Sequence, residues 1–257
     1  MDHCIVETRS GKIQGYEKEG LNIFMGIPFA ESPVGYLRFS PPAPKEPWSG
    51  VLDCTKPGPI VPQRDAPFSP KPLPPQSEEG CLNLNIWTPA ADAGRRHVLF
   101  WIHGGGFSFG SGSFDDGSQL ARRGDCVVVT INYRVNIFGF LYIKDKMANL
   151  GQLDQIMALR WVRENIDRFG GDPDNVTIFG ESAGSVAVCS LMAMPAAKGL
   201  FRRVIAESGS THPKAFNPQD GMNGAGKILA ALGVEDGDLD AMRKIPAETL
   251  VKVAEQM

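Results

Sequence analysis

The pattern of apolar and polar residues changes along this 257-residue chain, from alternation near the start to continuous apolar runs later. Alternation between turn residues predicts a small antiparallel meander over residues 4–6, 12–16 and 21–24. Later apolar runs predict further strands at residues 82–87, 98–102, 127–133, 176–179 and 203–206. The last three runs are continuous, which is typical of strands covered on both faces of a sheet.

Helical periodicity separates these strands. Between residues 151 and 169, apolar residues recur at three- and four-residue steps and form one stripe. Asp154 is expected in the first turn of this helix, where a negative charge suits the helix dipole. Two further helices are expected near 222–232 and 246–256. Alternating strands and helices predict an α/β protein with a mostly parallel central sheet.

A proline-rich segment interrupts the pattern, since residues 41–75 contain 12 of the 20 prolines. Proline cannot donate to a strand ladder, so this segment is expected to run as an extended excursion over the surface. A disordered linker is one interpretation of such a composition. Trp48 and Phe68 provide apolar anchors, which favours a loop pinned to the body of the protein.

Composition narrows the range of functions. The net charge is −3 with both signs interspersed, so no basic patch suggests a nucleic-acid partner. The longest apolar runs are strand-sized and far below the ~20 residues of a membrane span. The N-terminus lacks the pattern of a signal peptide, which favours the cytoplasm. Five cysteines show no metal-ligand spacing, and Cys126 and Cys189 are expected to be buried thiols.

The strongest local signal is a G-x-S-x-G motif at residues 180–184, which reads Gly-Glu-Ser-Ala-Gly. It follows the predicted strand at 176–179 and precedes a second apolar run at 186–192. A strand, a tight turn and a helix are the context of a nucleophile elbow, in which a strained turn exposes the serine Oγ. The motif therefore predicts that Ser182 is the nucleophile of an α/β-hydrolase fold.

A serine nucleophile also needs donors for the oxyanion that forms when it attacks. His103 and the three glycines at 104–106 directly follow the predicted strand at 98–102. Glycines let backbone N–H groups approach a substrate oxygen, and the N–H of Ala183, just after the nucleophile, completes the set. These glycines do not match G-x-G-x-x-G and no Gly-Lys-Ser/Thr follows them, so dinucleotide binding is not expected.

A base to activate this serine is harder to find. The four histidines are His3, His97, His103 and His212. The first two lie at predicted strand ends, and the third belongs to the glycine turn. His212 alone follows Ser182, but an elbow normally has its acid before its histidine, and Glu207 between them belongs to a strand end. His212 is therefore a weak candidate for the base.

Together these motifs resemble the N-terminal half of a type-B carboxylesterase, the family that includes the cholinesterases. The resemblance covers roughly residues 4–210, including the glycine turn and the stretch 169–184. Its further motifs are GIPFA at 26–30, PVGYLRF at 33–39, PWSG at 47–50, CLNLNI at 81–86, NYR at 132–134 and GFL at 139–141. The resemblance implies an α/β-hydrolase fold and hydrolysis of carboxylic esters, with no metal or organic cofactor.

The resemblance also assigns roles at the matching positions. Ser182 would attack the ester carbonyl and form an acyl-enzyme. Gly105, Gly106 and Ala183 would donate to the oxyanion. Glu181 would be the acidic neighbour that this family places beside its serine.

Two ion pairs and one disulfide are implied as well. The pairs are Arg38 with Glu79 and Arg134 with Asp154, and the disulfide joins Cys54 to Cys81. If buried, each ion pair would be costly to break from one side. The disulfide is absent from many bacterial relatives, and its presence would indicate a secreted protein rather than a cytoplasmic one.

Members of this family are about twice as long, and their catalytic Glu and His lie in the half that this chain does not match. We therefore expect residues 1–257 to form a single α/β-hydrolase domain without its C-terminal part. Its partners would be a small-molecule ester and, at an exposed sheet edge, a second copy or a complementing C-terminal half. Three alternatives remain open: a shorter lipase of the hormone-sensitive type, a non-catalytic cholinesterase-like binding or adhesion protein, and an inactive fragment of a split esterase.

Overall fold

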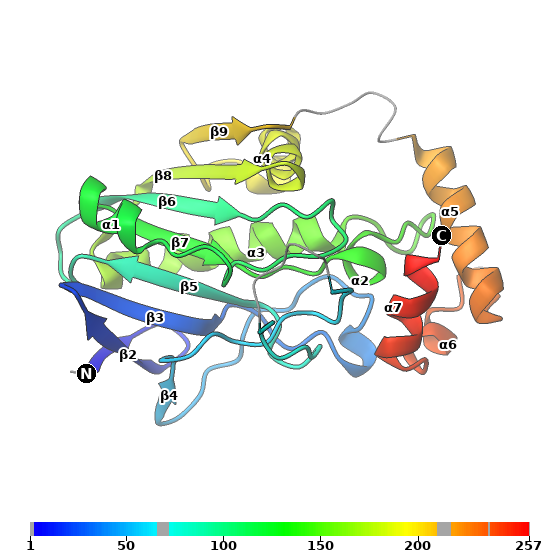
Figure 1. Ribbon diagram of the computed structural model, residues 1–257, viewed down its shortest axis with the longest axis horizontal. Coiled ribbons are helices and arrows are strands. Elements are labelled where there is room, and N and C mark those ends of the chain that lie inside the picture. Colours follow the sequence, from blue (N-terminus) through cyan, green and yellow to red (C-terminus); the bar gives the residue numbers. More distant parts are fainter. Residues whose placement is uncertain (1–2, 66–71, 210–216, 236, 257) are drawn as a thin grey trace.

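The computed structural model describes residues 3–65, 72–209, 217–235 and 237–256. Its central feature is a nine-stranded sheet, with helices packed against it and three more helices at one end (Figure 1). The strands are β1 (His3–Glu7), β2 (Lys12–Lys18), β3 (Leu21–Pro28), β4 (Val51–Asp53), β5 (Asn83–Thr88), β6 (Arg96–Ile102), β7 (Val127–Ile131), β8 (Gly171–Glu181) and β9 (Arg203–Glu207). The described ranges contain no helix with the length and hydropathy required to cross a bilayer.

The sheet is mixed. Its strand order is β1-β2-β3-β5-β7-β6-β8-β9, and β4 pairs with β2. From β1 to β7 in this order neighbouring strands run antiparallel, whereas β7, β6, β8 and β9 run parallel. The predicted N-terminal meander is confirmed in β1 to β3. The prediction of a mostly parallel sheet is correct only for the second half, because β5 continues the antiparallel pairing into the body of the sheet.

The helices are α1 (Ser118–Gly124), α2 (Asn136–Phe140), α3 (Leu150–Asn165), α4 (Ala183–Ala193), α5 (Pro218–Leu232), α6 (Leu239–Arg243) and α7 (Ala247–Glu255). Four helices agree with the predicted positions, and three short ones, α1, α2 and α6, were not predicted. The helix predicted at 151–169 is α3 followed by a 3₁₀ turn, Ile166–Phe169, which ends at Gly170 in the left-handed region. The short helix α6 was not predicted, although Asp238 caps it by accepting from Ala241 N–H at 2.9 Å.

Asp154 has a different role from the one expected. It lies beyond the first turn of α3, because that helix begins at Leu150. Its buried carboxylate accepts hydrogen bonds from the backbone N–H, Nε and Nη2 of Arg134 at 3.0, 2.8 and 2.7 Å. Arg134 is also buried and donates from Nη1 to the carbonyl of Ser40 at 2.8 Å. The predicted ion pair is therefore confirmed. It is buried and bidentate, and it joins α3 to the loop after β7.

The sheet separates two apolar clusters, because alternate residues of a strand face opposite sides. On one side, Trp87 of β5 and Val128 of β7 pack with Ala121 of α1. On the other side, a larger cluster includes Leu159 of α3 and Val188 of α4. Since α4 packs against β8 and β9 in this larger cluster, the core fixes the turn that joins β8 to α4.

The continuous apolar runs at β7 and β9 differ in how far their residues are buried. All five residues of β7 are buried, as predicted. In β9, Val204 is half-buried, and Arg203, Ile205, Ala206 and Glu207 are exposed. The prediction that β9 is covered on both faces is therefore wrong. It is the last strand of the described sheet, and no other described strand lies beyond it.

The proline-rich segment is pinned where the structure describes it. Trp48 donates from its indole N–H to the carbonyl of Lys12 at 3.1 Å. Ile60 donates its backbone N–H to the carbonyl of Pro75 at 2.9 Å. The pinned loop is thus confirmed at both ends, while Phe68 lies outside the described residues.

The second predicted ion pair has a different acid. Arg38 pairs with Glu78, which is buried, whereas the expected partner Glu79 is exposed. A turn at this point accounts for the one-residue difference, because it directs neighbouring side chains to opposite sides. Arg38 also donates from Nη1 to the carbonyls of Arg243 and Ile245 at 3.0 and 2.6 Å. This guanidinium therefore ties α6 and the start of α7 to the body of the protein.

Cys54 and Cys81 are buried free thiols, so the disulfide implied by the resemblance is not formed. Burial raises the pKa of Cys54 to about 12 and raises the pKa of Cys81 as well. Both groups therefore stay protonated at neutral pH. Cys126 is buried as predicted, and Cys189 is only partly buried.

Candidate active site

Ser182 lies in the turn between β8 and α4. Its backbone has φ 54° and ψ −118°, outside the regions that a residue with a side chain normally adopts. Hydrogen bonds hold this conformation: the N–H of Ser182 donates to the carbonyl of Glu207 at 3.0 Å, and the N–H of Val186 donates to the carbonyl of Ser182 at 3.0 Å. The strain is local and is maintained by strands and a helix packed on either side.

Two glycines allow this turn to form. A Cβ atom at Gly184 would overlap the carbonyl oxygen of Ile102 in β6. A Cβ atom at Gly180 would lie 2.5 Å from the carbonyl carbon of Gly184. Both positions therefore require glycine so that α4 can approach β8 and β6 closely.

The glycine turn after β6 lies directly against Ser182. A Cβ atom at Gly104 would lie 3.0 Å from Oε2 of Glu181 and 3.3 Å from Cβ of Ser182. Gly105 has a φ of 104° and Gly106 a φ of 61°, conformations that favour glycine. The carbonyl of Gly105 turns back to accept from Phe109 N–H at 3.2 Å. The structure thus brings the predicted glycines beside the predicted nucleophile.

Ala183 is the first residue of α4. The first N–H groups of a helix have no partners within the helix, so they are available to an anion or to an oxygen that carries a negative charge. The glycine turn and the start of α4 therefore both adjoin Ser182.

Ser182 and the glycine turn line a pocket of about 580 Å³. It includes Ser182 and Glu181, together with side chains that sequence reasoning did not identify. Asp115 is one of them: it accepts from the indole N–H of Trp101 at 2.7 Å, and partial desolvation raises the pKa of its carboxyl group. Trp101 follows the buried Phe100 in β6 and therefore lies on the other face of the sheet.

His103 is part of the wall and is buried. Its ring stacks on Tyr133 with centroids 4.3 Å apart, and the Tyr133 hydroxyl donates to the His103 carbonyl at 2.8 Å. Burial lowers the pKa of His103 to about 4, and Nδ1 lies 2.8 Å from the carbonyl oxygen of Gly104. The imidazole is therefore neutral at pH 7 and supports the turn. His212 lies outside the described residues.

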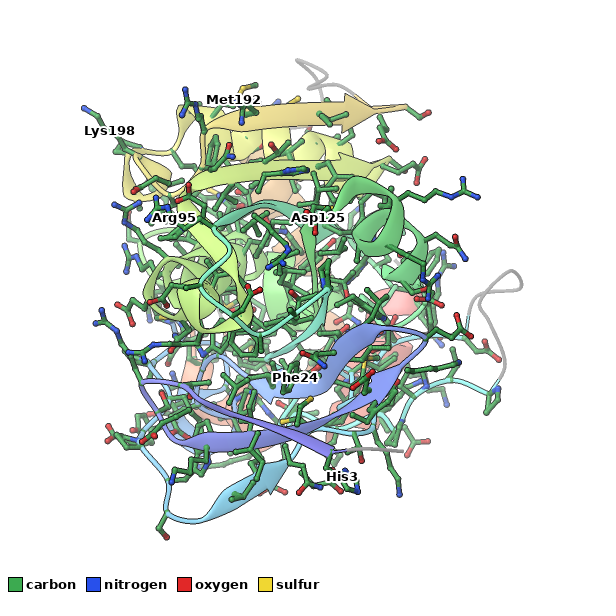
Figure 2. All side chains as sticks on the ribbon, turned by 90° about the vertical axis from the view of Figure 1, so that its left-hand side faces the viewer. His3, Phe24, Arg95, Asp125, Met192 and Lys198 are labelled. Atoms are coloured by element: carbon green, nitrogen blue, oxygen red, sulfur yellow. The ribbon has the colours of Figure 1, made fainter. Side chains whose placement is uncertain are left out.

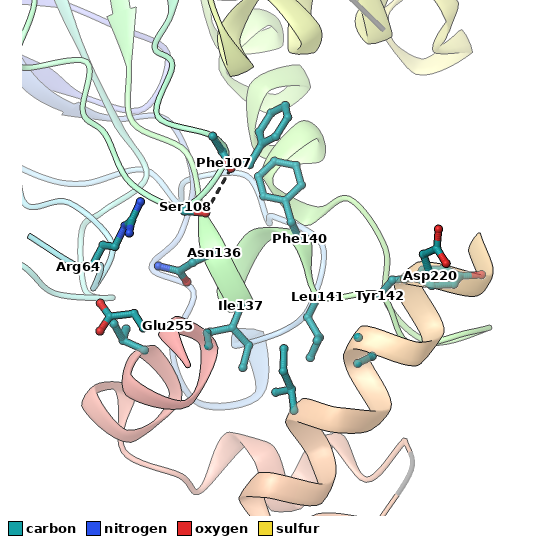
Figure 3. Close-up of a pocket in the computed structure, with 17 residues that line it drawn as sticks. Arg64, Phe107, Ser108, Asn136, Ile137, Phe140, Leu141, Tyr142, Asp220 and Glu255 are labelled. Atoms are coloured by element: carbon teal, nitrogen blue, oxygen red, sulfur yellow. Dashed lines mark hydrogen bonds between the residues drawn. The ribbon is translucent and has the colours of Figure 1, made fainter. Parts of the chain in front are cut away.

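A second pocket of about 470 Å³ adjoins the first at Gly106. Figure 3 shows its lining, with Phe107 and Phe140 on one side and α5 and α7 on the other. The rings of Phe107 and Phe140 are 4.6 Å apart. Charged side chains from three segments also line it: Arg64, Asp220 and Glu255. The two pockets therefore meet at the glycine turn.

The chain belongs to the carboxylesterase family, whose model matches residues 2–257. It is 46% identical over 265 residues to para-nitrobenzyl esterase of Bacillus subtilis strain 168, a match that covers 100% of this chain and 54% of that protein. It is 44% identical over 247 residues to liver carboxylesterase of Sus scrofa, with 89% of this chain and 44% of that protein covered.

Solved structures agree. A PNB esterase superposes with a TM-score of 0.94 at 45% identity, covering 99% of this chain and 54% of that one. Juvenile hormone esterase from Manduca sexta gives a TM-score of 0.93 at 35% identity, with coverages of 99% and 51%. The predicted α/β-hydrolase fold is confirmed, and the chain spans about half the length of the curated relatives it matches.

Proposed function

We propose that this chain supplies the nucleophile and the oxyanion donors for hydrolysis of small carboxylic esters. Ser182 Oγ would attack the ester carbonyl, and the tetrahedral oxyanion would accept hydrogen bonds from the N–H groups of Gly105, Gly106 and Ala183. Collapse of this intermediate would release the alcohol and leave an acyl group on Ser182. Water would then attack the acyl-enzyme and release the acid.

The observation that carries this proposal is the strained backbone of Ser182, held between β8 and α4 beside the glycine turn. Strained residues of this kind concentrate at functional sites, because ordinary packing has no use for the strain. Glu181 lines the same pocket, where a carboxylate would favour positive charge that develops beside the serine during the reaction.

Proton transfer needs groups that we propose lie outside these 257 residues. Among the described residues, the pocket contains one histidine, His103, and its imidazole is buried in the wall of the glycine turn. The carboxylesterase relatives are about twice as long as this chain. We therefore propose that the triad acid and histidine come from a complementing C-terminal half.

The test is hydrolysis of p-nitrophenyl butyrate by the chain alone and by the chain fused to the remaining half of Bacillus subtilis para-nitrobenzyl esterase. The fusion is expected to turn over, and Ser182→Ala to lower kcat by several orders of magnitude. The matched control is Ser190→Ala on the same helix, whose hydroxyl only donates to the carbonyl of Val186 at 2.9 Å. This control is expected to keep full activity.

Two results would contradict the proposal. Serine-dependent turnover by the chain alone would show that a base is present within these residues. A folded, active fusion that tolerates Ser182→Ala would show that Ser182 is not the nucleophile. Circular dichroism of each variant establishes that the fold is retained.

A further inference from the structure

The residues that follow the glycine turn fold back onto it, so that the chain forms a closed loop after β6. A Cβ atom at Gly105 would overlap the carbonyl oxygen of Phe109. A Cβ atom at Gly110 would overlap Nδ1 of His103. Because these segments are in direct contact, the position of Gly110 limits the positions that the glycine turn can take.

The side chain of Gln63 binds both backbone groups of Gly110. The N–H of Gly110 donates to Oε1 of Gln63 at 2.5 Å, and Nε2 of Gln63 donates to the carbonyl of Gly110 at 3.1 Å. Nε2 also donates to the carbonyl of Val61 at 3.1 Å. The backbone N–H of Gln63 donates to Oε1 of Gln76 at 2.9 Å. Since this buried amide has partners for both of its polar atoms, its orientation is fixed.

The residues on either side of that glutamine reach further points of the same loop (Figure 3). Nδ2 of Asn136 donates to the carbonyl of Pro62 at 2.9 Å, and the backbone N–H of Asn136 donates to the carbonyl of Phe107 at 2.6 Å. The guanidinium of Arg64 lies over the ring of Phe109, 4.9 Å from its centroid. The proline-rich segment is thus linked to the loop at three consecutive residues.

We propose that this part of the proline-rich segment, chiefly through Gln63, positions the glycine turn for catalysis. Gln63 is then a positioning residue: it holds Gly110 so that the N–H groups of Gly105 and Gly106 stay directed at the oxyanion. The proposal rests on the oxyanion role proposed above for these two glycines. A donor stabilises an oxyanion only if its N–H points at the place the oxygen will occupy. Glycine imposes little restraint on its own backbone, so contacts from outside the turn must provide that restraint.

The test is steady-state hydrolysis of p-nitrophenyl butyrate by the fusion described above, with and without Gln63→Leu. Leucine is of similar size but cannot bond to Gly110. The donors act on the oxyanion rather than on the bound ester, so kcat is expected to fall by about tenfold to a hundredfold, while KM changes by less than about twofold.

Two control variants each lose one side-chain interaction elsewhere. Trp48→Phe removes another bond of the proline-rich segment, the one to the carbonyl of Lys12 at 3.1 Å. Arg95→Met removes the ion pair with Asp172 before the amino end of β6, at the end of the molecule that faces the viewer in Figure 2. Both controls are expected to keep full kcat.

A thiono ester separates positioning from a loss of folded protein. Its C=S sulfur is a weak acceptor, so its hydrolysis depends less on the backbone donors. The ratio of kcat/KM for the ester to kcat/KM for its thiono analogue does not depend on how much of the enzyme is folded. Gln63→Leu is expected to lower this ratio by about threefold or more. Asn136→Asp, which keeps the shape of the side chain and removes the donor to Pro62, is a milder second variant and is expected to lower the ratio in the same direction.

A further measurement uses the chain itself and needs no turnover. In a sample labelled with ¹⁵N-glycine, the amide resonances of Gly105 and Gly106 are expected to shift in Gln63→Leu and to stay in place in Trp48→Phe. Unchanged resonances in Gln63→Leu overturn the proposal, and so does an active fusion in which Gln63→Leu alters neither kcat nor the ratio. A fusion without turnover contradicts the proposed function instead, and the glycine resonances still decide whether Gln63 positions the turn.

Discussion

β7 and β9 are two apolar runs of similar length in one sheet, but β7 is buried and β9 is largely exposed. β7 lies between β5 and β6, and all of its residues are buried. Among the strands that the structure describes, β9 pairs with β8 alone, and most of its residues are exposed. The difference shows that an apolar run predicts a strand but not its burial. How far a strand is buried depends on which other segments pack beside it.

The largest effect is expected in the interior, at the Arg134–Asp154 pair. Asp154→Ala would leave a buried guanidinium without its carboxylate and is expected to destabilise the protein by about 3–5 kcal/mol. The control is Glu19→Ala, which removes the exposed partner of Arg122 at 2.9 Å and should cost at most about 1 kcal/mol. Urea denaturation of both variants measures the two losses. Equal losses would mean that burial does not set the strength of these pairs.

The next effect is a pH dependence at the end of β6, another interior strand. Burial lowers the pKa of His103 in the folded protein to about 4, from its ordinary value of 6.5. A depressed pKa means that protonation favours the unfolded chain, so this contribution is present above pH 6.5 and is lost as the pH falls towards 4. The loss amounts to roughly 3 kcal/mol. Denaturation midpoints from pH 7 to 4 measure it, and His103→Asn should show a shallower decline. An NMR titration of the imidazole near pH 6.5 would contradict the assignment.

A smaller effect is expected where the helical group meets the body of the protein. Glu78→Gln removes the charge that faces Arg38 and is expected to cost roughly 1.5–3 kcal/mol. Glu79→Gln is the neighbouring control and should change stability by no more than about 0.5 kcal/mol, because Glu79 is exposed. Thermal unfolding of the two variants compares adjacent positions directly. A larger loss at Glu79 would restore the pairing expected from the sequence.

The smallest effect isolates the two strands themselves. Ile131→Val in β7 removes one buried methyl group and is expected to cost about 0.5–1.5 kcal/mol. Ile205→Val in β9 makes the same change at a half-exposed site and should alter the stability of the monomer by less than about 0.5 kcal/mol. Urea denaturation of both variants, carried out on dilute protein so that association does not contribute, measures the two losses. Similar losses at both sites would show that β9 is covered after all.

Local features of the fold were predictable from the sequence. The elbow, the glycine turn and helix α3 each depend on residues close together in the chain, where periodicity and glycine requirements act directly. Each of the two motifs directly follows a predicted strand, which favoured a common location for Ser182, Gly105 and Gly106. The structure brings these three residues to one pocket.

Features that depend on distant neighbours were not predictable. Periodicity does not state the direction of a strand, so the antiparallel pairing of β5 was missed. The choice of Glu78 over Glu79 depends on a turn that changes the side chain's direction by one residue. Asp115 enters the pocket through its contact with Trp101, and nothing in the local sequence of either residue indicates that contact.

The close approach of α4 to β6 has an evolutionary consequence. Gly180 and Gly184 are required by packing, since a side chain at either would collide with the backbone of a neighbouring segment. A descendant of this chain with no catalytic role would still be selected to keep both glycines, while the residue at position 182 would be free to change. In such a lineage the two glycines would remain as evidence of common ancestry. Only the residue at position 182 would then distinguish an enzyme from a non-catalytic relative.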